Sequence, residues 1–152
     1  MNNIHSKDIL LFGLAVSAVF FSVLMSGCIE GTQLVGQSEL TAVNGQKQEI
    51  TTQEYNLTVD TSAKLLRDGL SKKIVVSGNI TNDGTTDVFF VTLKSSFHHR
   101  NGGHVSNTPI IGVNFFSLRT GETKQFEMEY RAGYPNYILF DLVKHYKISI
   151  YV

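Results

Sequence analysis

Cysteine is nearly absent from this sequence: Cys28 is the one cysteine among 152 residues. A single thiol excludes a disulfide within the monomer, a CxxC redox pair and a cysteine-rich zinc site. Because no other thiol follows Cys28 in the chain, a cysteine nucleophile in the domain beyond it is excluded as well.

An excess of charge of either sign is lacking too. Lys and Arg together number 13, Asp and Glu together number 13, and the formal net charge is zero. Proteins that bind nucleic acids neutralise phosphates with clustered basic side chains, and this sequence has no basic run. It has no polybasic patch for anionic lipids either. We therefore expect no nucleic-acid partner.

Catalytic motifs are a third absence. The acidic residues are scattered, and no pair of them has the setting that glycosidase chemistry requires. No glycine-rich phosphate loop follows a strand and opens a helix, and no G-x-S-x-G elbow occurs. A nucleophile, a base and an orienting group cannot be placed together. We predict that the protein is not an enzyme and has no cofactor.

The longest apolar run lies near the N-terminus. Residues 9–25 carry no charge, follow a short polar segment that contains Lys7, and lead into the small residues Ser26 and Gly27. This order is typical of a secretory signal. The segment from Leu24 to Cys28 (LMSGC) resembles the lipobox of prokaryotic lipoproteins, with Met25 where Leu is usual. The resemblance implies that residues 1–27 are a lipoprotein signal peptide and that Cys28 becomes the lipidated first residue.

The alternative is an uncleaved N-terminal helix that anchors the chain. Seventeen apolar residues reach the lower limit for crossing a hydrocarbon core about 30 Å thick. Both alternatives leave the rest of the chain on the extracytoplasmic face, because the positive end of such a segment stays in the cytoplasm. We therefore expect a cell-surface protein held at the cell membrane by lipid on Cys28 or by this helix.

The remaining chain divides into a linker and a domain. Residues 28–48 are rich in Gly, Gln, Ser and Thr without a persistent apolar period, which predicts a flexible linker. Residues 49–152 show apolar residues at every second position between turn signals, which predicts short antiparallel strands with one solvated face. The alternating apolar positions are Tyr55, Leu57 and Val59; Ile74, Val76 and Ile80; Phe89, Val91, Leu93 and Phe97; Phe126, Met128 and Tyr130; and Tyr146, Ile148, Ile150 and Val152.

The strand count favours an all-β fold, an antiparallel β-sandwich of about seven strands. The turn signals are Asn82-Asp83-Gly84, Asn101-Gly102-Gly103 and Thr120-Gly121-Glu122. The segment 62–69 (SAKLLRDG) is the one helical hint of note, and a further helical turn is compatible with residues 138–143.

The order of these motifs resembles that of the FxLYD-type, immunoglobulin-like domains of prokaryotic, notably archaeal, surface lipoproteins. The matching segments are Val75 to Asn82 (VVSGNITN), Val88 to Phe97, Arg100 to Val105 (RNGGHV) and Leu118 to Phe126 (LRTGETKQF). Two departures occur: residues 95–99 lack most of the pattern that names the family, and Thr120 stands where Pro is common. The resemblance implies an immunoglobulin-like sandwich with a binding or structural role and without shared catalytic residues.

Three histidines close together in the sequence, His98, His99 and His104, are the most specific candidate for a chemical site. If Asn101-Gly102 forms a two-residue hairpin loop, His99 lies directly opposite His104, and their Cβ atoms are about 5 Å apart. Two imidazoles at that distance are weak candidates for a Zn²⁺ or Cu²⁺ site. His98 is expected on the other face, so a third ligand is missing. The alternative, which we favour, is a polar hairpin tip whose histidines are solvated and bind no metal.

Two sequons, Asn56-Leu57-Thr58 and Asn79-Ile80-Thr81, are candidate N-glycosylation sites. In the predicted strands, Asn56 and Asn79 both lie on the face opposite the apolar residues, where an enzyme reaches them. Chance sequons are common, so modification depends on a host that has the machinery.

Several aromatic residues do not fit the alternation. Phe89-Phe90 and Phe115-Phe116 are adjacent pairs, so each pair places one ring on the outer face of a regular strand. Tyr134, Tyr137 and Phe140 cluster in the loop 131–143. Exposed rings there would suit a glycan or a protein partner, whereas buried rings would cap one end of the core. We favour the cap.

Together these features predict a membrane-anchored cell-surface lipoprotein, a non-enzymatic binding or structural module with an unknown protein or glycan partner. Two alternatives remain open: a metal-binding protein that uses the 98–104 hairpin, and a carbohydrate-binding module that uses the aromatic residues of loop 131–143.

Overall fold

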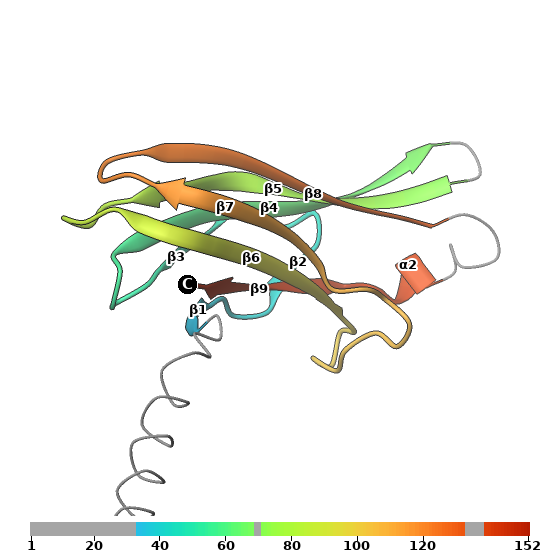
Figure 1. Ribbon diagram of the computed structural model, residues 1–152. Coiled ribbons are helices and arrows are strands. Elements are labelled where there is room, and N and C mark those ends of the chain that lie inside the picture. The colour runs from blue at the N-terminus through green and yellow to red at the C-terminus, as the bar shows by residue number, and fades with distance from the viewer. Residues whose placement is uncertain (1–32, 69–70, 133–138) are drawn as a thin grey trace, which may run out of the picture. The chain divides into compact units, whose positions relative to one another are not determined.

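The computed structural model describes residues 33–68, 71–132 and 139–152, and these form an all-β domain of two antiparallel sheets (Figure 1). The two sheets enclose one apolar core, so the domain is a β-sandwich. The predicted signal peptide 1–27 and Cys28 lie outside the described residues. Within the described ranges, no helix is long and apolar enough to cross a membrane.

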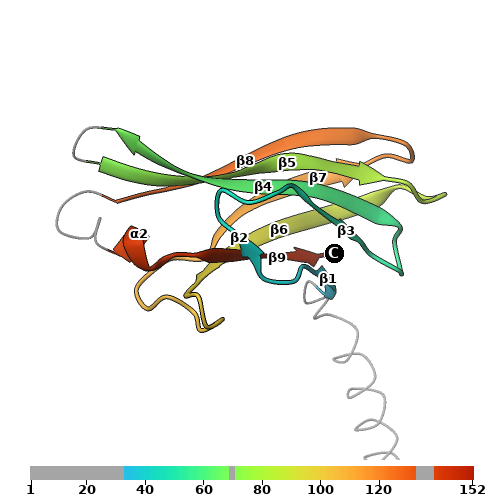
Figure 2. The same cartoon turned by 180° about the vertical axis from the view of Figure 1, so that it is seen from behind.

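The first sheet has four strands in the order β3-β4-β5-β8. They are β3 (Gln48–Thr51), β4 (Leu57–Asp68), β5 (Ser71–Asn82) and β8 (Thr123–Ala132). In the view from behind, β4 and β5 run along the length of the domain (Figure 2). The two are paired in unbroken register from Leu57↔Asn82 to Asp68↔Ser71.

The second sheet has the order β1-β9-β6-β7, and β2 also pairs with β9. Its strands are β1 (Leu34–Gln37), β2 (Thr41–Ala42), β6 (Val88–His98), β7 (Ile111–Leu118) and β9 (His145–Tyr151). The chain passes from one sheet to the other between β2 and β3, between β5 and β6, between β7 and β8, and between β8 and β9.

The core consists largely of the side chains that the alternation assigned to the inner faces. The buried members include Leu57, Val59, Ile74, Val76, Ile80, Val91, Leu93, Phe97, Phe126, Met128, Tyr146, Ile148 and Ile150. Their neighbours in each strand are half-buried or exposed. A period of two therefore predicted most of the inner faces, since successive side chains of a strand point to opposite sides of the sheet.

The helical hint over residues 62–69 is wrong. Residues 62–68 continue β4, where Ser62 pairs with Ser77 and Leu65 pairs with Ile74. Thr61 and Ala63 are buried while Lys64 and Leu66 are exposed, which is strand periodicity. Pairing with the whole of β5 outweighs the weak helical preference of so short a segment. The helical turn expected near 138–143 is present as α2 (Leu139–Leu142).

The flexible linker predicted over residues 28–48 is wrong for its described part. β1 pairs with the end of β9, with Leu34 opposite Tyr151, and β2 pairs with its beginning, with Thr41 opposite Tyr146. Between these strands the Ser38 amide donates to the Ile148 carbonyl at 2.9 Å, and the Ile148 amide donates to the Ser38 hydroxyl at 2.9 Å. The exposed edge of β9 supplied backbone partners that the local sequence pattern does not reveal.

Candidate functional site

The hairpin of residues 98–104, which we call the histidine hairpin, lies at one end of the sandwich, but its register differs from the prediction. The His99 amide donates to the Gly103 carbonyl at 2.8 Å, and the Gly102 amide donates to the His99 carbonyl at 3.1 Å. Gly102 has φ = 88°. These features describe a three-residue loop whose last residue is left-handed, in place of the two-residue loop that we assumed. The extra loop residue moves the pairing by one position.

This shift changes which histidines meet. His98, not His99, is the bridge partner of His104, and their ring centroids are 5.6 Å apart at an interplanar angle of 84°. On its other side His98 is paired in register with His145 of β9. The proposed His99–His104 pair is therefore wrong. Instead, His99 lines an open hollow with Asp141 and Lys144.

Both ring nitrogens of His98 have hydrogen-bond partners. Nδ1 lies 3.0 Å from the Gly102 carbonyl oxygen, so Nδ1 carries the hydrogen and donates it. Nε2 lies 2.9 Å from the Ser96 hydroxyl and, in the neutral ring, accepts from it. Burial is the main cause that lowers the pKa of His98, and the nearby His104, Lys147 and His145 add to it, while the Gly102 hydrogen bond opposes them.

The His98 environment is that of a neutral, structural imidazole. A metal ion on Nε2 would have to displace the Ser96 hydroxyl, and one on Nδ1 would break the hydrogen bond that closes the hairpin loop. Across the described residues, no group of three or more His, Cys, Asp or Glu side chains is arranged to hold a metal ion. The hairpin thus brings together two imidazoles, those of His98 and His104, and both ring nitrogens of His98 already take part in hydrogen bonds.

The two sequons lie in different settings. Asn79 is in the middle of β5 on the outer face of the sheet, half-exposed, beside a shallow hollow that Gln125 and Glu127 also line. Asn56 is exposed, but it lies between the turn 53–55 and β4, with φ = 49°, and its carbonyl accepts from the Asp83 amide at 2.9 Å. The expectation that both lie on strand faces is therefore correct for Asn79 and wrong for Asn56.

Among the aromatic residues of loop 131–143, only Phe140 lies within the described residues; Tyr134 and Tyr137 do not. Phe140 is buried, and its ring stacks on that of Tyr130 with centroids 4.9 Å apart. Tyr130 in turn stacks on Phe97, at 6.0 Å. Phe140 therefore caps the core, as the favoured interpretation predicted for this residue, and presents no face to a glycan.

The adjacent phenylalanine pairs form the most exposed apolar surface described. Phe116 is 73% exposed and Phe115 packs against the core, as a regular strand predicts. In β6, however, Phe89 and Phe90 are both exposed, at 51% and 63%, so the prediction that Phe89 faces inwards is wrong. Phe90 has φ = 56°, and this irregularity lets Val88 and Val91 both be buried with two outward residues between them.

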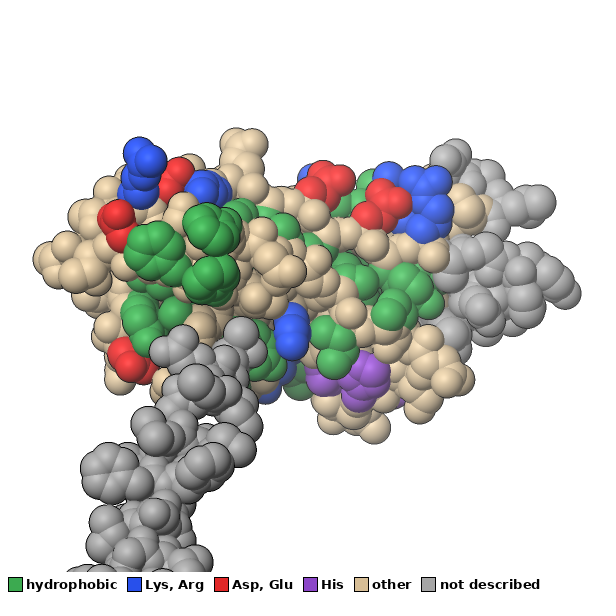
Figure 3. All heavy atoms as spheres, in the orientation of Figure 1, with side chains coloured by type: hydrophobic (Ala, Val, Ile, Leu, Met, Phe, Trp, Pro, Cys, Tyr) green, Lys and Arg blue, Asp and Glu red, His purple; other side chains and the backbone are tan. Residues whose placement is uncertain are grey.

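We call Phe89, Phe90 and Phe116 the phenylalanine patch. The rings of Phe90 and Phe116 meet edge to face, with centroids 5.2 Å apart. In the space-filling view, hydrophobic side chains gather over the start of β6 and the end of β7 (Figure 3). The patch and the histidine hairpin lie at opposite ends of β6, because that strand begins at Val88 and ends at His98.

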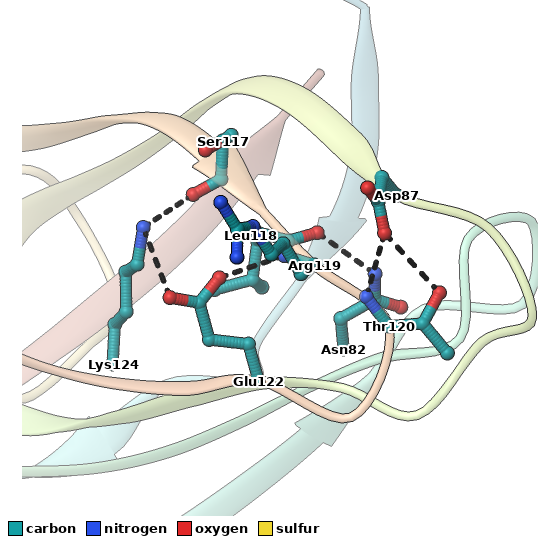
Figure 4. Close-up of polar contacts among 8 residues, drawn as sticks. All are labelled: Asn82, Asp87, Ser117, Leu118, Arg119, Thr120, Glu122 and Lys124. Atoms are coloured by element: carbon teal, nitrogen blue, oxygen red, sulfur yellow. Dashed lines mark hydrogen bonds and ion pairs between the residues drawn. The ribbon is translucent and has the colours of Figure 1, made fainter.

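A polar network joins the turn before β6 to the turn after β7 (Figure 4). The buried Asn82 side-chain amide donates to the carbonyls of Leu118, at 2.9 Å, and Thr86, at 2.8 Å, while its oxygen accepts from the Gly84 amide. Asp87 accepts from the Thr120 amide at 2.9 Å. These bonds connect the β5–β6 turn to the β7–β8 turn.

A second carboxylate closes the β7–β8 turn itself. The Glu122 carboxylate accepts from the Arg119 amide at 2.7 Å, and this hydrogen bond is the main cause that lowers the pKa of Glu122. The ammonium group of Lys124 lies 3.5 Å from the same carboxylate and donates to the Ser117 carbonyl. The charged groups at this end of the sandwich thus stabilise the turns that carry the patch.

No protein-family model matches this sequence, and neither a curated protein nor a solved structure matches it.

Proposed function

We propose that this protein is a lipid-anchored module on the extracytoplasmic face of the cell membrane, a non-enzymatic β-sandwich with a binding or structural role. The observation that carries this proposal is the close spacing of the lipobox-like cysteine and the sandwich. Cys28 ends the apolar N-terminal segment, and the first strand begins at Leu34.

The spacing gives the anchor a short reach. Five residues, 29–33, separate Cys28 from β1. At about 3.5 Å per residue, the six Cα–Cα steps from Cys28 to Leu34 extend to roughly 20 Å at most. Lipid on Cys28 would therefore hold one end of the sandwich close to the headgroups and leave the other end, with the histidine hairpin, free to meet a partner.

The strand order supports the immunoglobulin-like part of this proposal. In immunoglobulin domains strands A, B and E are neighbours in one sheet, and C′, C and F are neighbours in the other. Here β4, β5 and β8 stand in the first relation, and β7, β6 and β9 stand in the second. β1 lies beside β9, where strand G would lie. Asn82, the last residue of the motif VVSGNITN, has the buried turn-connecting role described above.

The test is the intact mass of the protein extracted from native membranes, with a Cys28→Ser variant beside it. The proposal expects a mass that lacks residues 1–27 and includes added lipid, and it expects both changes to disappear in the variant. An unmodified full-length mass would show that residues 9–25 are retained as an anchor and that Cys28 is not lipidated. Recovery of the wild-type protein in the soluble fraction would overturn the membrane attachment altogether.

A further inference from the structure

We propose that the phenylalanine patch docks on the membrane surface, so that the sandwich lies against the bilayer instead of hanging from its anchor. This inference rests on the proposed lipid anchor and adds an orientation to it. The occupant that we assign to Phe89, Phe90 and Phe116 is the interfacial region of a phospholipid bilayer.

The first argument is the place where the chain enters the domain. Leu34 pairs with Tyr151, and Tyr151 pairs with Thr92, so these residues form one row across β1, β9 and β6. Gln33, the residue before Leu34, hydrogen-bonds to Val152. Since β1 and β6 are both antiparallel to β9, they run in the same direction, and Gln33 lies on the same side of this row as Phe90. At about 4.8 Å per strand and 3.3 Å per residue, Phe90 lies on the order of 12 Å from Leu34.

That distance is short compared with the reach of the anchor. The segment 29–33 brings Cys28 to within roughly 20 Å of Leu34. A lipid chain inserted at Cys28 therefore holds the patch near the bilayer at a high effective concentration, and a weak apolar contact becomes effective under such tethering. The patch lies at the end of the sheet where a membrane anchor would arrive.

The second argument is the chemistry of the surface. Leu34 is 48% exposed and adds an apolar side chain at the same end of the sheet. On the same outer face, the Lys94 ammonium group lies over the Tyr151 ring, 4.6 Å from its centroid. Aromatic rings favour the headgroup level of a bilayer, and Lys extends its charge from an apolar surface towards water. Because the chain is neutral and has no basic run, its contact with a bilayer would depend on apolar area and not on attraction to anionic headgroups.

The third argument is the backbone of Phe90. A positive φ is rare for a bulky residue within a strand. Such backbone strain lowers the free energy of unfolding, and it is found mainly at functional positions. In a regular strand one of two adjacent rings would face the core. The irregularity exposes both, and the network around Asn82 joins the turn before β6 to the end of β7. The domain thus maintains an exposed aromatic surface at some cost.

The sequence contains no tryptophan, so a single introduced indole reports on its own surroundings. We would insert the full-length, lipid-modified protein into phosphatidylcholine liposomes as a Phe90→Trp variant. The control is a Leu66→Trp variant, because Leu66 is an exposed apolar residue of β4, in the other sheet. The readouts are flotation with the liposomes, the emission maximum, and quenching by phospholipids brominated on the upper part of the acyl chain.

We expect the Phe90→Trp indole to emit at shorter wavelength in liposomes and to be quenched at least threefold more by brominated lipid than the Leu66→Trp indole. Equal, weak quenching of both in protein that floats would overturn the docking and leave the anchor standing. A blue shift without lipid quenching would also overturn it, since a second copy of the chain or another protein would then cover the patch. Protein that does not float would overturn the proposed anchor, and the docking with it.

Discussion

The side chain of Asn82 donates to the main-chain carbonyl of Leu118 at 2.9 Å, from the end of β5 in one sheet to the end of β7 in the other. Both residues are fully buried. A buried carbonyl without a partner is costly, so this bond helps to fix how the two sheets meet at the end that carries the phenylalanine patch.

The first prediction is that Asn82→Ala destabilises the domain. The change leaves the carbonyls of Leu118 and Thr86 without this donor and the Gly84 amide without this acceptor. We expect the free energy of unfolding to fall by about 2–4 kcal/mol, measured by urea unfolding in circular dichroism. Asn79→Ala, on the half-exposed outer face of the same strand, should change it by about 0.5 kcal/mol or less. Equal effects would contradict the role assigned to Asn82.

The second prediction concerns Gly78, in the middle of β5. A Cβ atom there would lie 1.8 Å from the main-chain oxygen of Asp60 in the neighbouring strand, which no rotation of a side chain relieves. We expect Gly78→Ala to lower the free energy of unfolding by about 3 kcal/mol or to prevent folding. Gly103→Ala is the control, because its Cβ atom would meet nothing closer than 3.4 Å. If the Gly78→Ala protein were as stable as that control, β4 and β5 would have to lie farther apart at this position than the structure places them.

The third prediction separates a core cap from a glycan-binding ring. Phe140 is buried and stacked on Tyr130, whereas Leu142 is an exposed apolar residue of the same short helix. Phe140→Ala should cost about 3–5 kcal/mol of unfolding free energy. Leu142→Ala should cost about 0.5 kcal/mol. If thermal denaturation gave equal midpoints for the two variants, the helix would not close the core.

The fourth prediction is a dependence of stability on pH through His98. Its folded pKa lies below the ordinary value of 6.5, so the unfolded chain takes up a proton more readily than the folded one. The contribution of His98 to stability is therefore complete above pH 6.5 and is lost as the pH falls through the folded pKa. The lowered pKa values of Glu122, Glu129 and Asp141 act in a more acidic range, below their ordinary values of 4.5, 4.5 and 3.8.

The measurement is the urea midpoint at pH 7.5 and at pH 5.5. We expect the wild-type midpoint to fall between these values and the midpoint of His98→Gln to fall by less. His99→Gln is the matched control, because it removes the adjacent histidine and keeps the His98 hydrogen bonds; its midpoint should fall as in the wild type. A slope that is the same in the wild type and in His98→Gln would assign the effect to other groups.

The fifth prediction concerns residues 33–48, the described part of the segment whose sequence predicts a flexible linker. The amides of Ser38 and Val43 donate to the carbonyls of Ile148 and Lys144, each at 2.9 Å. In hydrogen exchange these two amides should be protected, and in an isolated peptide of residues 33–48 they should exchange freely. Equal exchange in the two samples would mean that β1 and β2 do not remain paired with β9 in solution.

The errors of the sequence interpretation have a common origin. The helical hint over residues 62–69 is wrong for residues 62–68 because so short a segment does not set its own conformation, and pairing with β5 makes it a strand. Residues 34–42 lack an apolar pattern, and β9, more than 100 residues later in the chain, pairs with them. The histidine register depended on one residue of loop length, which the dipeptide Asn101-Gly102 does not specify.

The sequence by itself determined which side chains most strands bury, where the tight turns fall and which thiol chemistry is excluded. These properties are local: they depend on a period of two, on residues that tolerate positive φ, and on composition. The tertiary structure decided which strands pair, that His98 and not His99 meets His104, and that Phe89 and Phe90 both face outwards. Those outcomes depend on backbone partners far apart in the chain, because a strand's hydrogen bonds are completed only by the neighbour that the fold brings beside it.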